Sequence, residues 1–386
     1  MALIRSLVRG KINLAFSLLL ALLGCGLGAL PAAAKLRSLT NLVVIGDSYS
    51  DAGNSGLLTA PAVGSPGFPM PFYSNGRFSN GPVAVEQLWS QINPSQPSLQ
   101  PSLAPGGGTN YAVGGATTGL NSYFKVAADM PDSLRDYYIN TSAHGQLSQL
   151  LSAFTPGSFV PSSSLFVLWL GANDGLYWLS TPQSPTTGLT PGGITGSLPD
   201  EATAAELLQN SMLNISTGLQ ALIANGAQHL LVPNLLDFGR APGFSGNPPL
   251  AAAARNLSLG FNQLLAQTLD QLRISNPGVD IMGFDTYALF EDIFAAPGAY
   301  GFSDISQACT TIYAPMVFTP GCSASADGWL FWDGVHVTSA AHSLIASRMV
   351  HTVYEVPGPL PAVGGVVAFG WARRLRQRQR QPRARR

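Results

Sequence analysis

The stretch "LVVIGDSYSDAGN", residues 42–54, places four apolar residues directly before Gly46, Asp47 and Ser48. An apolar run that stops at Gly, Asp and Ser is typical of a buried strand that ends in a turn. The same position is where α/β proteins bind ligands, because parallel strands present their carboxyl ends at one edge of the sheet. Ser48 is therefore either an ordinary turn residue or a nucleophile. A nucleophile requires a base, a group that orients the base, and donors for an oxyanion elsewhere in the chain.

Short apolar runs alternate with helix-like segments along the chain, which is the pattern of βα units around a parallel sheet. Five runs predict strands, at residues 41–46, 109–114, 164–171, 229–234 and 279–284. Six segments predict helices, at residues 81–92, 143–154, 200–225, 250–275, 286–296 and 338–354. Stretches rich in Gly, Pro and Ser predict long loops, at residues 55–80, 92–108, 180–198 and 297–328. We expect one domain with helices on both faces of the sheet.

The charged residues are unevenly distributed along the 386-residue chain, although its formal net charge is zero. Three of the 20 Lys and Arg lie in residues 1–11 and eight lie in residues 373–386. The remaining nine share residues 12–372 with all 20 acidic side chains. An acidic body between two basic ends argues against nucleic acid as the substrate, because a phosphate backbone requires a basic face.

The N-terminal region is typical of a secretory signal peptide. Basic residues precede an apolar run over residues 12–30, and "PAAAK" follows as a small-residue cleavage site after Ala34. A transmembrane anchor is the first alternative, but the run is near the lower limit for a span and is rich in small residues. A lipoprotein signal at Cys25 is the second, and Leu23 is unusual before its Gly-Cys pair. We expect residues 1–34 to be removed.

The C-terminal region, residues 357–386, combines a Pro-rich break, about a dozen apolar residues and an arginine cluster. Its apolar part is too short to span a bilayer comfortably. The region resembles the PEP-CTERM class of bacterial sorting tails, with "VPGPLP" where that class has Pro-Glu-Pro. The resemblance implies partners in the export and sorting machinery. The chain is therefore predicted to be secreted or held in the bacterial cell envelope, with residues 35–356 as its functional domain.

Cys309 and Cys322 are the two cysteines of this predicted domain. In an exported protein such a pair is most simply a disulfide. A metal site would require more ligands nearby, and none of the five histidines lies between the two cysteines. We therefore expect a disulfide, and we expect neither a metal nor a cofactor.

Asp333 and His336 lie three residues apart in "FWDGVH", just before a predicted helix. In such a loop the carboxylate can accept a hydrogen bond from one imidazole nitrogen, which leaves the other free to take a proton from a serine. The alternative is a helix-entry loop in which Asp333 is merely polar. Trp329, Phe331 and Trp332 weaken that alternative, because a carboxylate among aromatic residues requires a partner.

Two further strand ends offer donors for an oxyanion. "NYAVGGATT", residues 110–118, ends a predicted strand on two glycines, where the backbone of Gly115 can approach a ligand. "LGANDG", residues 170–175, ends another on Asn173, whose side-chain amide can donate. Each signal alone is weak. Parallel strands nevertheless carry all these groups to one edge of the sheet.

The four blocks, with Ser, Gly, Asn and His in that order, resemble the GDSL or SGNH hydrolase family over residues 42–342. "FSNGPVAVEQL" also resembles the family's stretch after its first block. By this resemblance Ser48 is the nucleophile, His336 the base and Asp333 its orienting carboxylate, while Gly115, Asn173 and the Ser48 amide form the oxyanion hole. Tyr49 departs from the family, which has Leu after the nucleophile. The implied fold is α/β, a flavodoxin-like three-layer α/β/α sandwich around a mostly parallel sheet of five strands.

The resemblance implies a secreted serine esterase or lipase that hydrolyses small-molecule or lipid esters without a cofactor. Two alternatives stay open. A carbohydrate O-acetylesterase would use the same chemistry on a sugar ester. A surface or matrix protein could keep the fold without turnover, and the sorting tail is the feature that favours it. The aromatic residues Phe68, Phe72, Tyr73 and Phe78 line either an acyl pocket or a packed loop.

Overall fold

The computed structural model of the chain describes residues 39–120, 122–126, 130, 132–153, 160–180, 203–311 and 317–354. The predicted signal peptide and sorting tail lie outside these ranges, as does nearly all of the predicted loop at 180–198. Residues 37–353 belong to one compact unit, and the fold below is that of its described part.

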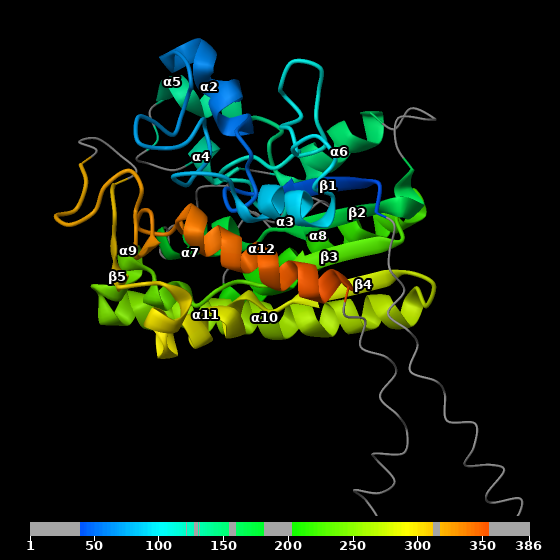
Figure 1. Ribbon diagram of the computed structural model, residues 1–386. Coiled ribbons are helices and arrows are strands. Elements are labelled where there is room, and N and C mark those ends of the chain that lie inside the picture. Colours follow the sequence, from blue (N-terminus) through cyan, green and yellow to red (C-terminus); the bar gives the residue numbers. More distant parts are fainter. Residues whose placement is uncertain are drawn as a thin grey trace, which may run out of the picture. The chain divides into compact units, whose positions relative to one another are not determined.

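A parallel sheet of four strands lies at the centre of this unit (Figure 1). In order along the sheet they are β1 (Asn41–Gly46), β2 (Ser164–Trp169), β3 (His229–Pro233) and β4 (Asp280–Phe284). β2 is buried along its whole length, because parallel sheets are covered on both faces and therefore require nearly continuous apolar runs. The four strands match four of the predicted ones, and they confirm an α/β fold with a parallel sheet.

The fifth predicted strand, residues 109–114, does not form. The segment runs parallel to β1, where Val44 donates to the Thr109 carbonyl (2.9 Å) and accepts from the Tyr111 amide (2.8 Å), but only an isolated bridge at Asn110 results. The next donor on this edge of β1, the Gly46 amide, donates to Gln146 Oε1 (2.9 Å) instead of to the segment, so the ladder does not continue. The sheet of the described residues therefore has four strands rather than the five expected, with the segment lying along its β1 edge.

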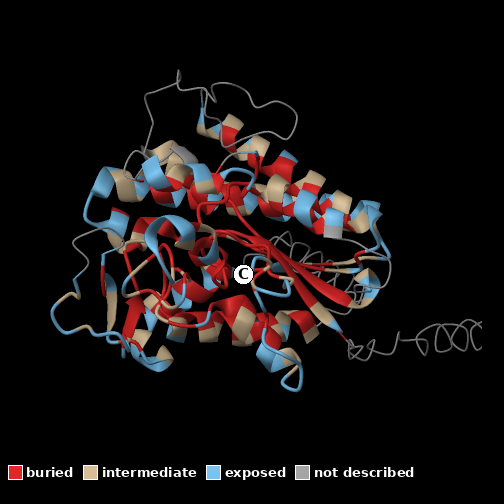
Figure 2. Ribbon diagram, turned by 90° about the horizontal axis from the view of Figure 1, so that it is seen from above, coloured by how far each residue is buried: buried red, intermediate tan, exposed pale blue. Residues whose placement is uncertain are grey.

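All six predicted helices form. They are α3 (Ala84–Ile92), α6 (Ala143–Ala153), α8 (Ala204–Ala224), α10 (Pro248–Ser275), α11 (Thr286–Ala295) and α12 (Ser339–Tyr354). α8 begins at a capping box, in which Thr203 accepts from the Glu206 amide while the Glu206 carboxylate accepts from the Thr203 amide. Helices lie on both faces of the buried strands (Figure 2). The described residues therefore show the three layers that the alternating pattern predicts.

Shorter elements occur where the sequence predicts loops or nothing regular. They are α2 (Asn54–Val63), α4 (Tyr123–Val126), α5 (Asp132–Arg135), α7 (Ala172–Ser180), α9 (Pro242–Ser245), β5 (Asp304–Ala308) and β6 (Trp329–Phe331). α2 was missed because its buried residues are small or polar and give no apolar period. Its first turn is instead fixed by Asp51, whose carboxylate accepts from the amides of Asn54 (2.6 Å) and Ser55 (3.1 Å).

A disulfide joins Cys309 and Cys322 in the segment between β5 and β6. Cys309 is fully buried and packs in a small cluster with Tyr73, Ala326, Trp329 and Trp332. Phe72 and Phe318 extend this cluster, with their ring centroids 4.4 Å apart. The disulfide therefore packs against the loop that carries Tyr73, although the two are far apart in the sequence.

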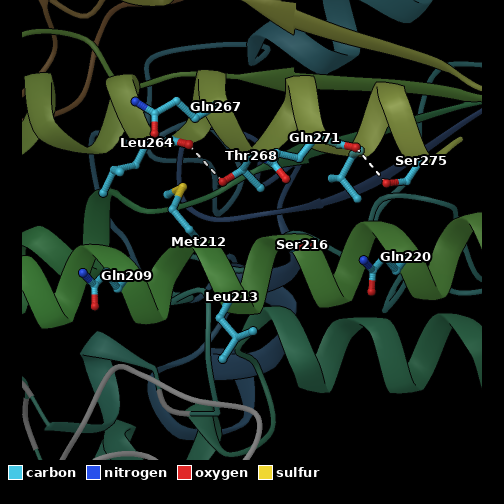
Figure 3. A pocket seen from close by; sticks show the side chains of 11 residues that line it. Gln209, Met212, Leu213, Ser216, Gln220, Leu264, Gln267, Thr268, Gln271 and Ser275 are labelled. Carbon is cyan, nitrogen blue, oxygen red and sulfur yellow. Dashed lines mark hydrogen bonds between the residues drawn. The ribbon is translucent and has the colours of Figure 1, made fainter.

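α8 and α10 lie side by side and border a groove of about 460 Å³ (Figure 3). Its lining carries amide, hydroxyl and apolar side chains but no charge. The hydroxyls of Thr268 and Ser275 donate to carbonyls one turn back in α10 (both 2.9 Å), and so face their own helix. Among the described helices, none combines the length and apolar character required to cross a membrane.

Candidate active site

Ser48 lies in the turn that directly follows β1, at the carboxyl edge of the sheet. Asp47 closes this turn: its carbonyl accepts from the Ser50 amide (3.0 Å) and its Oδ1 accepts from the Tyr49 amide (3.0 Å). Ser48 is only 5% exposed. The Gly-Asp-Ser sequence thus does form a turn, and the turn holds the serine at the edge where parallel sheets bind ligands.

Asp333 and His336 lie between β6 and α12 and reach Ser48 through hydrogen bonds. His336 Nε2 lies 2.8 Å from Ser48 Oγ, and His336 Nδ1 lies 2.7 Å from Asp333 Oδ2. Asp333 Oδ1 accepts from the amides of Val335 (2.8 Å) and His336 (2.7 Å), so the backbone wraps around the carboxylate. The three predicted catalytic side chains therefore form a continuous relay, with distances suited to proton transfer from serine to imidazole.

The pKa values of two carboxylates, one in this relay and one beside it, are shifted in opposite directions. Burial raises the pKa of Asp333, but the charge of His336 and the hydrogen bonds from His336 and Tyr73 outweigh it, so the net pKa is lowered. Burial raises the pKa of Asp47 to about 7, even though the Tyr49 amide and His336 act against it. At neutral pH Asp333 is thus ionised beside His336, whereas Asp47 is partly protonated.

The predicted oxyanion donors lie in adjoining loops. Gly115 has a φ of +77°, and a Cβ there would lie 2.5 Å from a ring carbon of Phe124, so both backbone and space require glycine. Asn173, in the first turn of α7, donates from Nδ2 to the Ala116 carbonyl (3.0 Å), next to Gly115. Neither the Ser48 amide nor the Gly115 amide donates to another described residue. Amides in this state can donate to an oxyanion.

Two sets of hydrogen bonds hold these loops at the sheet edge. The Val113 amide donates to the Gly46 carbonyl at the end of β1 (3.2 Å). The Asp174 carboxylate accepts from the Thr118 amide (3.0 Å) and from the Thr118 hydroxyl (2.6 Å), which joins the first turn of α7, with Asn173, to the loop of Gly115. The four sequence blocks are therefore brought to the same edge, as their positions after the strands predict.

Two side chains beside the relay were not predicted as part of it. The Tyr73 hydroxyl donates to Asp333 Oδ2 (2.6 Å). Gln146 pairs with both backbone groups of Gly46, accepting from its amide (2.9 Å) and donating to its carbonyl (2.8 Å). Both contacts join residues at least 100 positions apart, so no local pattern reveals them.

The stretch "FSNGPVAVEQL" joins the loop of His336 to the first third of the chain. Ser79 Oγ donates to the Val337 carbonyl (3.0 Å), and Asn80 Oδ1 accepts from the Ser339 amide (2.8 Å). Both bonds lie within three residues of His336. This stretch therefore helps to position the loop of His336.

The other histidines do not join the relay. His342 is buried on α12, and burial lowers its pKa to about 3, so it stays neutral. His229 Nδ1 lies 2.9 Å from Asp280 Oδ2 at the opposite end of the sheet. In the described ranges no three His, Cys, Asp or Glu side chains are grouped to hold a metal ion. The groove between α8 and α10 contains none of the predicted site residues.

A Ser-His-Asp relay at the carboxyl edge of a parallel α/β sheet is an arrangement used by hydrolases with a serine nucleophile. The family model described as GDSL-like Lipase/Acylhydrolase matches residues 42–349 of the chain. The chain belongs to this family, and it is a carboxylic ester hydrolase. The family and the enzyme class predicted from the four blocks are thereby confirmed.

Three similar proteins carry names of ester and acyl chemistry. The chain is 30% identical to a GDSL esterase/lipase of Arabidopsis thaliana, over 80% of this chain and 83% of that protein. It is 29% identical to acetylajmalan esterase 2 of Rauvolfia serpentina, over 80% and 89%. It is 26% identical to the phosphatidylcholine-sterol acyltransferase of Aeromonas hydrophila, over 86% and 97%.

Proposed function

We propose that the protein is a secreted serine esterase or lipase in which Ser48 forms the acyl-enzyme, His336 is the general base and acid, and Asp333 orients His336. One observation carries this proposal: the unbroken relay from Asp333 Oδ2 to His336 to Ser48 Oγ, with distances of 2.7 and 2.8 Å. The ionised Asp333 carboxylate sets the direction of proton transfer along this relay. It accepts from His336 Nδ1–H and so leaves Nε2 free to accept the Ser48 proton.

In the proposed reaction, Ser48 Oγ attacks the ester carbonyl carbon while His336 Nε2 takes the hydroxyl proton. The tetrahedral intermediate then collapses, and His336 returns that proton to the departing alcohol, which leaves the acyl group on Ser48. Water then attacks the acyl carbon, and His336 takes a proton from the attacking water. When the second intermediate collapses, the acid leaves and Ser48 regains its proton.

The oxyanion of each intermediate would be bound by the amides of Ser48 and Gly115 and by Asn173 Nδ2. The Asn173 amide has two N–H groups and uses one on the Ala116 carbonyl, so the second can serve the oxyanion. Such donors stabilise the charge that develops in the transition state, and each is typically worth on the order of 10²–10³ in rate.

For the substrate we propose esters with an apolar acyl group. An apolar cluster separate from the main core borders the relay, with the members Phe68, Phe78, Val113, Phe124, Met130, Leu134 and Tyr138. The Phe78 ring centroid lies 5.0 Å from that of His336, and Phe124 packs against Gly115. An acyl chain bound at Ser48 would thus meet aromatic surface rather than hydroxyl-binding groups.

The test of the function is a panel of nitrophenyl esters from acetyl to palmitoyl, measured together with an acetylated oligosaccharide. We expect kcat/KM to rise from acetyl toward medium acyl chains, because each buried methylene contributes about 0.8 kcal/mol. A ratio of at least about tenfold between the best ester and the acetyl ester is the expected result.

The two alternatives predict different results in the same panel. Hydrolysis confined to acetyl groups, with the acetylated oligosaccharide preferred, would identify a carbohydrate O-acetylesterase. Absence of turnover on every ester would contradict the esterase proposal and favour a surface or matrix role.

We also propose that the protein is exported, that residues 1–34 are a removed signal peptide, and that residues 357–386 are a removed sorting tail. The disulfide of Cys309 and Cys322 supports an oxidising compartment. The arginine cluster after Ala372 would hold the tail at the cytoplasmic face during export, as the positive-inside rule expects.

Intact-mass measurement of the exported protein tests this proposal. We expect a mature chain that begins near Lys35 and ends near residues 357–361, and that keeps nine basic and 20 acidic side chains. An exported chain that still carried "RRLRQRQRQPRARR" would contradict removal of the tail. A culture that expresses the chain with its tail arginines replaced by glutamine serves as the control, because this tail should no longer be held at the cytoplasmic face during export.

A further inference from the structure

The Asp333 carboxylate is held by one group from a distant part of the chain. Its Oδ1 is bound by two amides of its own loop, whereas Oδ2 lies against His336 Nδ1 (2.7 Å) and the Tyr73 hydroxyl (2.6 Å). Tyr73 is 260 positions away from Asp333 in sequence. The oxygen that faces the imidazole is thus shared between His336 and the Tyr73 hydroxyl.

Tyr73 is itself firmly placed. The residue is buried, and its ring packs edge-on against Trp332 (centroids 5.9 Å apart) and against Phe78 (6.4 Å). The chain that follows Tyr73 is closed into a loop by a bond from the Ser74 amide to the Ser79 carbonyl (2.9 Å). The hydroxyl therefore meets the carboxylate from a rigid aromatic support.

A carboxylate held only through Oδ1 and His336 can rotate about its Cβ–Cγ bond as the imidazole moves. A second donor on Oδ2 opposes that rotation, and it keeps the oxygen satisfied while the proton on His336 is transferred. Packing alone does not require a hydroxyl at this position, because phenylalanine fills nearly the same volume.

We propose that Tyr73 is a positioning residue of the esterase: its hydroxyl fixes Asp333 Oδ2 in the orientation that holds His336 toward Ser48. This inference rests on the proposed function, since it gives Tyr73 a role through Asp333 and His336. It assigns a role to one member of the aromatic loop, residues 68–78, which the sequence alone leaves divided between acyl pocket and packed loop.

The variant Tyr73→Phe tests the inference, because it removes one oxygen and keeps the ring. We expect kcat for a nitrophenyl ester to fall about 10- to 100-fold, the range of a hydrogen bond to a charged group. KM should stay within about twofold, because Tyr73 has no contact with the substrate in the proposed mechanism. Rates are expressed per active site, counted by titration with a fluorophosphonate, so that loss of folded protein does not enter kcat.

A double-mutant cycle separates positioning from packing. In an Asp333→Ala background no carboxylate remains to be oriented, so adding Tyr73→Phe should change kcat by less than about twofold. Tyr111→Phe is the matched control, since Tyr111 is also a buried tyrosine but packs in the main core. It should retain the wild-type kcat.

The outcomes are distinct. Wild-type kcat in Tyr73→Phe would overturn the inference, and so would an equal fall in both backgrounds, which would show that the hydroxyl acts on the aromatic packing. Asp333→Ala with wild-type turnover would reject the proposed function, and with it the role of Tyr73. If Asp333→Ala lowers kcat strongly while Tyr73→Phe leaves kcat unchanged, the Tyr73 inference alone is rejected.

Discussion

Replacing Ser48 with alanine is expected to lower kcat for nitrophenyl esters by about 10⁶-fold, the loss found when a serine nucleophile is removed from a complete relay. Ser48 Oγ is the atom that His336 Nε2 contacts at 2.8 Å, and alanine has no atom there to form the acyl-enzyme. The same variant should lose covalent labelling by a fluorophosphonate, which wild type should show. The labelled peptide, identified by mass spectrometry, should contain residues 47–50.

Ser50→Ala provides the matched control for this measurement. Ser50 is also buried, two positions along the same turn, and its hydroxyl has no hydrogen-bond partner among the described residues. Labelling and turnover should therefore survive in Ser50→Ala. If Ser48→Ala and wild type are labelled equally, another residue is the nucleophile.

Replacing Asp333 with asparagine is expected to lower kcat by about 10⁴-fold with little change in KM. The low pKa of Asp333 keeps it as a carboxylate that accepts from His336 Nδ1–H. An asparagine side chain can present its NH₂ group to that nitrogen, which favours the tautomer with a proton on Nε2. In that tautomer His336 cannot accept the Ser48 proton. Stopped turnover with retained substrate binding is the signature to measure.

Asp237→Asn controls for the loss of a buried carboxylate. Asp237 is fully buried at the start of a short helical turn, where it pairs with Arg255 (2.6 Å) and accepts from the Gly239 amide rather than from a member of the relay. Its replacement should reduce the melting temperature yet leave kcat per active site unchanged. Equal losses of turnover in both variants would mean that Asp333 supports the fold rather than the base.

The strands at the centre of the fold were predictable because burial on both faces makes their sequences nearly all apolar. β2, with "SLFVLW", is the clearest case. Residues 109–114 also predict a strand, yet the Gly46 amide that would extend their pairing with β1 donates to the Gln146 side chain, and the segment makes only isolated bridges at Asn110. Side-chain hydrogen bonds of this kind are not visible in a hydropathy pattern, which explains the missing fifth strand.

The candidate site likewise has one part that the sequence predicts and another part that it does not. Ser48 and Asn173 follow strands of the sheet, and His336 precedes a helix. Gly115 follows a segment that runs parallel to β1, so the meeting of these residues at one sheet edge could be predicted from topology. Tyr73 lies in a loop whose path is set by packing on Trp332 and on the segment of Cys309, and nothing local specifies that path. Its contact with the carboxylate therefore required the structure.

The separation of 288 positions between Ser48 and His336 has a consequence for the timing of activity. Ser48 follows the first strand, whereas His336 precedes the last helix, α12, and is fastened to Ser79 and Asn80 only through residues 337–339. In the proposed mechanism, a growing chain that lacks these last elements has the nucleophile Ser48 without its base, His336. We therefore expect the protein to be inert toward esters throughout its synthesis and to become active in one step, when the final segment docks. Ester turnover thus reports the completed fold. Chains truncated before α12 should show no ester hydrolysis even where the sheet has formed.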